Sequence, residues 1–313
     1  MPGRVDARRI LVIHNPTAGW RRPRLLQDLV ALLRAAGRQV TVRPTLHPAH
    51  AIELAGEADR RHVDMIVAAG GDGTINEVLN GLQPDRPGEA PIPLALCPLG
   101  TANVLAQEIG LRLDAASLAD CILQGRLRWV ALGECRGPAV PPRVFIQMLG
   151  VGFDAQVVAD VSRPLKNRLG RWAYVLMSGR QAFGYHFPAF RVRIDGRAFA
   201  ARSVIVANGR HYGGRYVAAP EADLERDSLE VCLFRHRGPL HVARYGVALL
   251  AGRLSRLPDV TIHRGREVEI LGPAAEPVQG DGDLFGLTPV SLSLAGTRQP
   301  LVVPASQDAG SGR

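Results

Sequence analysis

Apolar runs of strand length alternate with helical repeats through the first third of the chain. The run Ile10–Ile13 ends at Asn15-Pro16, and leucines at helical spacing then continue to Gly37. Three further runs of this kind follow, at residues 40–42, 63–69 and 94–97. Because a helical crossover returns the chain in its original direction, this alternation predicts a parallel, doubly wound α/β sheet. Such sheets bind ligands at the carboxyl ends of their strands.

The pattern of apolar and turn residues changes after about Leu127. Short runs rich in β-forming residues then dominate, separated by turn residues, which is typical of an antiparallel β-sandwich. The length of 313 residues suits two domains. We therefore expect an α/β domain at 1–127 and a β-sandwich domain at 128–305. The small polar residues at 306–313 predict a disordered tail.

Composition sets limits on compartment and partners. No apolar run reaches the ~18–20 residues of a transmembrane helix, and the N-terminal run is too short for a signal peptide, so we expect a cytoplasmic protein. The four cysteines form no C-x-x-C pair, which favours buried, reduced thiols. The net charge of +9 fits either an arginine-rich composition or attraction to a polyanion, such as a nucleotide, a nucleic acid or an anionic membrane.

A glycine-rich loop, Gly70–Thr74, lies between an apolar strand and a helix. Glycines allow the backbone to approach phosphate oxygens, and a helix N-terminus attracts negative charge. Asp72 would repel phosphate unless a cation lay between them, so the loop predicts binding of a magnesium nucleotide. The alternative is a tight turn followed by a capping box formed by Thr74 and Glu77.

Two other loops have the same character. Asn15–Gly19 follows the first strand, and Gly100–Asn103 follows the fourth. Loops after the first, third and fourth strands of a parallel sheet open on the same edge. We therefore expect the three loops to form one nucleotide site.

The segments NPTAG, GGDGTINEVLNGL, PLGTANVLA, GVGFDA and DGD resemble, in this order, the motifs of the diacylglycerol kinase catalytic superfamily. The resemblance runs from about Ile10 to Leu294. GGDGT alone is shared with NAD kinases and phosphofructokinases, whereas its combination with GTAN and a late DG-acid motif is much more specific. The resemblance implies a Rossmann-like N-terminal domain, a β-sandwich C-terminal domain, and ATP in the cleft between them. It also implies Mg²⁺ and transfer of phosphate to a hydroxyl of a membrane lipid.

The resemblance assigns roles to particular residues. Asp281 and Asp283 stand where the family has D-G-E, and they would supply the general base and its support, since a lipid hydroxyl must lose its proton. The alternative is that Asp281-Gly282 is only a hairpin turn. Asp72 and Asp227 would bind metal. The nucleotide contacts would be Asn15, Pro16, Thr17, Ala18, Gly19, Thr45, Gly70, Gly71, Asp72, Gly73, Thr74, Asn76, Glu77, Gly100, Thr101 and Asn103.

Three positions depart from the family pattern or leave alternatives open. Val104 follows the GTAN asparagine, where many relatives have an aspartate, and this removes a carboxylate from the site. Asp227 matches a ligand of a structural Mg²⁺, but Ser228 replaces the usual glycine, so a solvated acidic turn is the alternative. Asp154, in GVGFDA, is either a turn residue or a supporting acid.

The segment Lys166–Phe187 interleaves basic and aromatic residues, which is typical of a helix that lies in a membrane interface. The alternative is a helix packed on the sandwich. We expect peripheral contact with the inner face of an anionic membrane and no binding of nucleic acid. The sequence favours neither a diacylglycerol-like nor a sphingoid acceptor. Two other functions compete with the lipid kinase: a NAD-kinase-like enzyme with a soluble substrate, and an ATP-binding regulator that has lost catalysis.

Overall fold

The computed structural model describes residues 7–18, 22–82, 91–161, 171–273 and 275–305. The chain divides into two compact units, Met1–Val130 with Thr297–Arg313, and Ala131–Gly296. The first predicted boundary lies three residues from the observed one. The assignment of residues 297–305 to the second domain is wrong, because strand β20 (Gln299–Val303) returns to the first unit and pairs there. The predicted tail at 306–313 lies outside the described residues.

The first unit contains one six-stranded sheet of order β2-β1-β3-β4-β20-β5. Strands β1 to β4 are parallel, as predicted, and β20 pairs in parallel with β4 and antiparallel with β5. Every residue of β3 and β4 is buried, as expected for central strands of a sheet with both faces covered. The bounds of the strands are β1 (Arg9–His14), β2 (Gln39–Pro44), β3 (Met65–Gly70), β4 (Leu94–Pro98) and β5 (Arg126–Val130).

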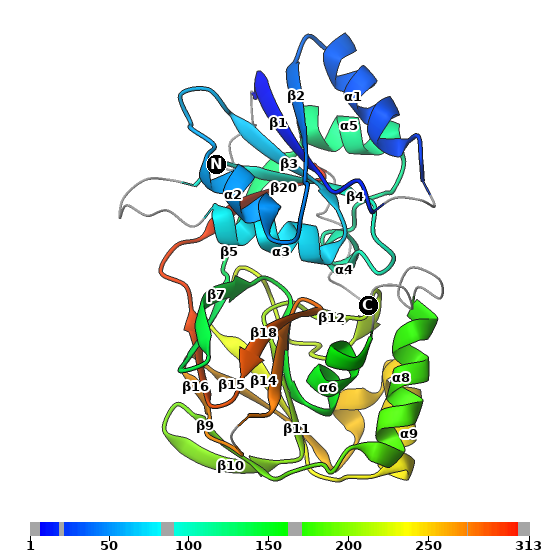
Figure 1. The fold of residues 1–313 in the computed structure, drawn as a ribbon, viewed down its shortest axis with the longest axis vertical. Helices are drawn as coiled ribbons and strands as arrows, with labels where there is room; N and C mark the ends of the chain where they lie inside the picture. Colours follow the sequence, from blue (N-terminus) through cyan, green and yellow to red (C-terminus); the bar gives the residue numbers. More distant parts are fainter. Residues whose placement is uncertain (1–6, 19–21, 83–90, 162–170, 274, 306–313) are drawn as a thin grey trace. The chain divides into compact units, whose positions relative to one another are not determined.

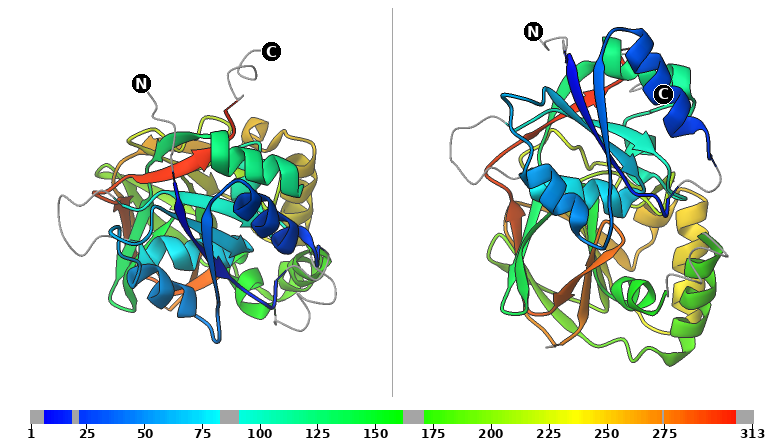
Figure 2. Two further views of the ribbon diagram at one scale, coloured as in Figure 1. Left: turned by 90° about the horizontal axis from the view of Figure 1, so that it is seen from above. Right: turned by 45° about the horizontal axis from the view of Figure 1, so that its top comes forward.

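Helices cover both sides of this sheet (Figures 1 and 2). Helix α1 packs against α5, and α2 packs against α3. Leu25, Leu29 and Leu33 form the buried face of α1, as their helical spacing predicts, whereas Leu32 is exposed. The bounds of the helices are α1 (Leu25–Ala35), α2 (His50–Gly56), α3 (Asp72–Gly81), α4 (Val104–Glu108) and α5 (Ala115–Gln124).

The second unit is an antiparallel sandwich, which confirms the predicted fold class. Its two six-stranded sheets have the orders β10-β9-β16-β19-β6-β7 and β15-β14-β11-β8-β17-β18. The bounds of the strands are β6 (Gly133–Gly137), β7 (Val140–Phe145), β8 (Met148–Gly152), β9 (Phe190–Ile194), β10 (Arg197–Ala201), β11 (Ser203–Ala207), β14 (Leu229–Phe234), β15 (Val260–Gly265), β16 (Val268–Ile270), β17 (Pro277–Gly280), β18 (Asp283–Leu287) and β19 (Val290–Leu294). A short ribbon pairs β12 (His211–Tyr212) with β13 (Tyr216–Val217).

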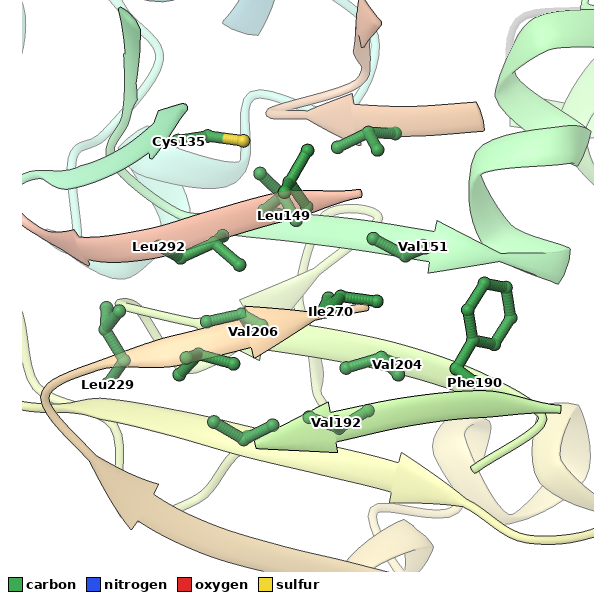
Figure 3. Close-up of a cluster of buried hydrophobic side chains, with 14 of the residues drawn as sticks. Cys135, Leu149, Val151, Phe190, Val192, Val204, Val206, Leu229, Ile270 and Leu292 are labelled. Atoms are coloured by element: carbon green, nitrogen blue, oxygen red, sulfur yellow. The ribbon is translucent and has the colours of Figure 1, made fainter. Parts of the chain in front are cut away.

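Apolar side chains from both sheets fill the sandwich. Leu149 and Val206 come from one sheet, and Phe190, Ile270 and Leu292 come from the other (Figure 3). The cysteines are free and buried, as predicted, and burial raises the pKa of each thiol to about 12. The core of the sandwich is therefore apolar. The four buried thiols of the chain are held in the unreactive protonated form.

In the part of the second unit that the structure describes, the sandwich is accompanied by α6 (Phe153–Asp160), α8 (Arg171–Gly184) and α9 (Pro239–Leu250), and the single turn η1 (Leu254–Arg256) follows α9. Helix α8 packs against both α6 and α9. No helix in the described ranges is long and apolar enough to cross a membrane.

Two of the aromatic residues expected to face a membrane are buried instead. Tyr185 and Phe187 are about as buried as core residues, and Phe187 stacks on Phe153 with ring centroids 5.5 Å apart. Their prediction as membrane contacts is wrong, because the chain turns inward after α8 to enter β9. Phe183, on α8 itself, is 82% exposed. Lys166 and Arg168 lie outside the described residues.

Candidate functional site

The three loops predicted to share a site meet at the carboxyl edge of the first unit's sheet. The Asn15 N–H donates to the Ala69 carbonyl at 2.9 Å, and the Asn15 side-chain amide donates to the Thr74 hydroxyl at 3.2 Å. The Leu99 N–H donates to the Gly70 carbonyl at 2.8 Å. The loops after β1, β3 and β4 are therefore joined to one another, which confirms their predicted convergence.

Glycine is required in these loops because they pack backbone against backbone. A Cβ on Gly100 would lie 2.6 Å from the Cα of Gly71, which is closer than carbon atoms can approach. A Cβ on Gly70 would lie 2.3 Å from the Thr74 hydroxyl oxygen. The glycines thus allow the loops after β3 and β4 to come into contact. The same absence of side chains leaves the backbone of these loops open to an approaching ligand.

Asp72 holds the loop after β4 in place. Its Oδ1 accepts a hydrogen bond from the Val104 N–H at 2.7 Å, which joins the start of α3 to the start of α4. The departure from the family at position 104 therefore removes a side-chain carboxylate and leaves this backbone contact in place. Metal binding by Asp72 stays a prediction.

The predicted capping box is wrong. Helix α3 begins at Asp72 with Gly71 as its N-cap, so Thr74 lies inside the helix, where it is buried. The Glu77 carboxylate instead accepts the N–H groups of Ala49 and Ala51 at 3.1 and 3.3 Å. This carboxylate therefore caps the start of α2, and that contact accounts for it without a nucleotide.

Asn76 is fully buried, and its side-chain oxygen accepts a hydrogen bond from Asn80 at 3.0 Å. The structure thus argues against its predicted nucleotide contact, because the side chain has no surface to offer. Asn76 instead connects two turns of α3. Gly19 lies outside the described residues, so its contact stays a prediction.

The remaining residues of the three loops fit an anionic ligand. Within the described ranges no side chain caps the N-terminus of α3, a helix of ten residues whose dipole favours negative charge there. Asn103 is almost completely buried with a left-handed backbone, and its Oδ1 has no hydrogen-bond partner in the described structure. Thr101 is exposed beside it. The uncapped start of α3 at this sheet edge suits phosphate oxygens, whereas the Asn103 amide donates to the Gly100 carbonyl at 2.9 Å and its buried oxygen can only accept a hydrogen bond.

The other predicted contacts lie at the same edge. The Thr45 N–H donates to the His14 carbonyl at 2.8 Å, at the point where β1 and β2 end. The Thr17 N–H and hydroxyl both donate to the Asn15 side chain, at 3.0 and 2.8 Å. This Asx turn includes Pro16 and shapes the first loop, with Ala18 following it.

In the second unit, Asp281 occupies the hairpin between β17 and β18. Its carboxylate accepts three backbone N–H groups, those of Ile146 at 2.9 Å, Gln147 at 2.9 Å and Met148 at 3.1 Å. Its own N–H donates to the Met148 carbonyl at 2.9 Å, and its φ is 50°. The structure therefore confirms the hairpin turn, which Asp281 also ties to the start of β8, and the catalytic role of Asp281 stays a prediction.

Asp283 differs from Asp281 in its surroundings. It is the first residue of β18 and is partly exposed, and its carboxylate makes no hydrogen bond or ion pair with any residue that the structure describes. The turn thus holds one carboxylate that is fully engaged by backbone donors and one that is open to a ligand.

A buried polar chain supports the turn. Asp154 accepts hydrogen bonds from the Tyr212 hydroxyl and, at 2.6 Å, from the Gln279 amide, whose oxygen accepts the Gly282 N–H at 2.9 Å. Burial raises the pKa of Asp154, although both hydrogen bonds act in the opposite direction. Asp154 is therefore the supporting acid left open by the sequence, and it acts through Gln279.

Gln147 and Asn208 were missed by the sequence analysis. Both are almost fully buried, and the side-chain oxygen of each, together with the Gln147 amide nitrogen, lacks a partner in the described structure. The Asn208 amide donates to the Ala131 and Ile146 carbonyls at 2.8 Å each. No sequence motif marks either side chain, and the partners of the Asn208 amide are more than 60 residues away.

The surroundings of Asp227 do not fit a cation. This exposed residue shares a surface hollow with Arg226, Arg264 and Arg266. The nearby Asp195 carboxylate accepts the Arg266 and Glu267 N–H groups. Asp227 belongs to no set of three ligand-type residues within the described ranges. Metal binding by Asp227 stays a prediction, and the arginines that line the hollow argue against it.

Comparisons with known proteins agree with this geometry. Residues 9–135 match the family described as "Diacylglycerol kinase catalytic domain", and residues 147–304 match "YegS C-terminal NAD kinase beta sandwich-like domain". The chain is 34% identical over 298 residues to a "Probable lipid kinase YegS-like" of Pseudomonas aeruginosa, covering 90% of this chain and 92% of the relative. It is 27% identical over 288 residues to a "Diacylglycerol kinase" of Bacillus subtilis, with the same coverage.

A solved diacylglycerol kinase structure from Bacillus anthracis shares the fold, with a TM-score of 0.72, 21% identity and coverage of 95% of this chain and 97% of that one. Two matched family domains therefore account for nearly the whole chain, in the order in which the fold presents them. The chain belongs to the diacylglycerol kinase family of lipid kinases, with a C-terminal domain of the YegS type.

Proposed function

We propose that this protein transfers the γ-phosphoryl group of ATP to a hydroxyl of a membrane lipid, either diacylglycerol-like or sphingoid. The observation that carries the proposal is the joining of the loops after β1, β3 and β4 at one sheet edge, with Gly71 and Gly100 in contact. Family membership supports a lipid as the acceptor.

The first unit would hold the nucleotide. The uncapped start of α3 would face phosphate, and Asp72, whose Oδ1 already holds Val104, would hold the cation. Mg²⁺, when bound, neutralises charge on the phosphates. The residues of this chain position the nucleotide and keep the loops fixed around it.

The second unit would supply the proton acceptor. In the proposed step, the lipid hydroxyl oxygen forms a bond to the γ-phosphorus while Asp283 takes the hydroxyl proton. The bond from the γ-phosphorus to the bridging oxygen breaks, and its electron pair leaves with ADP. Asp281 positions Asp283, because its three backbone hydrogen bonds fix the turn that carries both residues.

The proposal is tested by incubating the purified protein with Mg²⁺ and ATP labelled at the γ-phosphate. The acceptors are diacylglycerol, a sphingoid base and phosphatidylglycerol in mixed micelles, and soluble NAD. We expect label in an organic-soluble product with at least one lipid and none with NAD. Label in NAD alone would replace the lipid kinase with a NAD-kinase-like enzyme. ATP binding without transfer to any acceptor would indicate an inactive regulator.

The charge of Asp72 can be tested separately from its contact with Val104. An Asp72→Asn variant keeps an oxygen for the Val104 N–H but loses the negative charge. We expect its affinity for Mg²⁺-ATP to fall about tenfold or more, because the hard cation loses an anionic oxygen ligand. Calorimetric titration with and without Mg²⁺ measures the effect, and Asp120→Asn, at an exposed position on α5, is the control. An equal Mg²⁺-ATP affinity in both variants would contradict the assignment.

A further inference from the structure

Helices α8 and α9 expose large apolar side chains on the second unit. On α9, Leu240, Val247 and Leu250 are 85%, 67% and 64% exposed, and on α8 Leu176 and Phe183 are 53% and 82% exposed. The two helices pack against each other and lie side by side in Figure 1. We call these five residues the α8–α9 face. Soluble proteins seldom leave so many large apolar side chains together in water unless the surface binds something.

The orientation of α9 is fixed by its opposite side. The Tyr245 hydroxyl and the Arg244 guanidinium donate to the buried Asp259 carboxylate at 2.7 and 2.8 Å, and Ala248 is buried beside them. Positions 240, 243, 247 and 250 follow the spacing of one helix face, which lies away from Tyr245 and Ala248, and Arg244 lies at the border of that face. The apolar stripe is therefore presented by the fold and is not the frayed end of a helix.

The segments that contain these helices carry the excess positive charge of the protein. Residues 161–187 and 235–256 contain ten basic and no acidic residues. The whole chain has 38 basic and 29 acidic residues, which leaves 28 basic and 29 acidic residues for all other positions. The rest of the protein thus has a net charge of −1. Of the basic residues, Arg237 and Arg253 are exposed just beyond the two ends of α9.

An apolar stripe with arginines at both ends suits one kind of partner. A second copy docked by the same face would place like charges opposite one another, which is costly at an interface. An anionic bilayer accepts apolar side chains below its headgroups and guanidinium groups among them. We propose that the α8–α9 face docks on an anionic lipid surface, with α9 lying in the plane of the interface. This inference rests on the proposed function, since it places the protein at the membrane that holds its acceptor.

The inference is tested by flotation of the full-length protein with vesicles of phosphatidylcholine, with and without 30–40% phosphatidylglycerol, at low and high salt. We expect binding only to the anionic vesicles, and weaker binding at high salt, because screening shortens the range of the arginine charges. In a Leu240→Gln/Val247→Gln/Leu250→Gln variant, partitioning should fall about tenfold or more, since three apolar groups no longer enter the bilayer. Leu32→Gln, at an exposed leucine of α1, is the matched control and should bind as the wild type does.

The contribution of positive charge to vesicle binding is tested with a second pair of variants. Arg237→Gln/Arg253→Gln should lower binding to anionic vesicles by about tenfold or more, because each arginine near an anionic surface contributes to the attraction. Arg191→Gln/Arg197→Gln removes the same charge from the exposed side of β9 and β10 and should leave binding unchanged. Equal loss in both variants would show that net charge alone attracts the protein, and this would overturn the assigned face.

Kinase activity on a water-soluble short-chain acceptor separates this inference from the proposed function. We expect the three-residue α9 variant to retain that activity while losing activity on vesicles. If the wild type binds vesicles through this face but phosphorylates no lipid, the surface stands and the proposed function fails. If the variant binds vesicles as well as the wild type, or if light scattering shows a dimer that the α9 changes abolish, the inference is wrong.

Discussion

An Asp283→Asn variant is expected to lose about 10²–10⁴-fold in kcat, the range over which a general base contributes. The carboxylate of Asp283 makes no hydrogen bond or ion pair with any residue in the described ranges, so it is open to the hydroxyl of an acceptor. Asparagine has nearly the same shape but cannot take a proton. The expected loss is therefore in turnover, measured with saturating ATP and lipid.

The stability and ATP affinity of this variant should match the wild type, because the residue supports no other part of the fold. Glu221→Gln, at an exposed acid of the same unit, is the control for a lost negative charge. Asp283→Glu provides a sharper test, since it restores the side chain of the family's D-G-E motif. We expect this variant to keep or raise activity, because nothing holds the shorter side chain in place. Full turnover by Asp283→Asn would show that the proton leaves by another route.

The sequence predicted the edge at which the nucleotide loops meet because parallel strands impose it. Once the strands after Ile10, Val63 and Leu94 were identified, topology alone placed their loops together. The structural role of the glycines in these loops was predicted less well. Gly70 accommodates the Thr74 side chain and Gly100 accommodates Gly71, so these residues serve contacts within the loops before any contact with phosphate. A sequence cannot show this, because the close approach depends on two loops that are separate in the chain.

Long-range partners account for the errors. Strand β20 joins the first sheet after more than 160 residues of intervening chain, so its local β pattern gave no information on which domain it would complete. Asp154, Gln279 and Tyr212 come together from three separate elements, and only the first belongs to a recognisable motif. Two of the arginines that line the hollow at Asp227 are likewise distant in sequence, since Arg264 and Arg266 lie at and just after the end of β15. Local patterns thus predicted the elements, while the tertiary structure decided the roles of several polar residues.

Two Asp-Gly turns in the sandwich allow a direct test of whether Asp281 is only a turn residue. Asp195, before Gly196, also has a positive φ, of 45°, and its carboxylate accepts the Arg266 and Glu267 N–H groups at 2.9 Å each. These backbone hydrogen bonds lower the pKa of Asp195. The residue two positions after it is Arg197, whereas Asp281 is followed at the same distance by Asp283. In both turns, backbone N–H groups therefore hold the aspartate carboxylate. The turn at Asp281 carries a second carboxylate, whereas the turn at Asp195 carries an arginine.

Replacement of Asp281 by asparagine presents an amide N–H₂ to a backbone donor that needs an acceptor, because both carboxylate oxygens of Asp281 accept N–H groups. We expect Asp281→Asn to lower the free energy of unfolding by about 2–4 kcal/mol, because a charged acceptor of several hydrogen bonds is lost and a buried donor is left unpaired. Asp195→Asn should cost less, about 0.5–1.5 kcal/mol, because both N–H groups bond to the same oxygen, Oδ1, which asparagine keeps while only the charge is lost. Urea denaturation measures both changes.

Turnover separates the two positions. At a temperature where both variants are folded, Asp281→Asn should lower kcat by about tenfold or more, because a small displacement of a reacting group is costly. Asp195→Asn should leave kcat unchanged, since its turn carries no proton acceptor. The affinity for ATP should be unchanged in both variants. If the two variants lose stability and neither loses turnover, Asp281 does not position Asp283, and the late Asp-Gly motif of this chain is a turn like the one at Asp195.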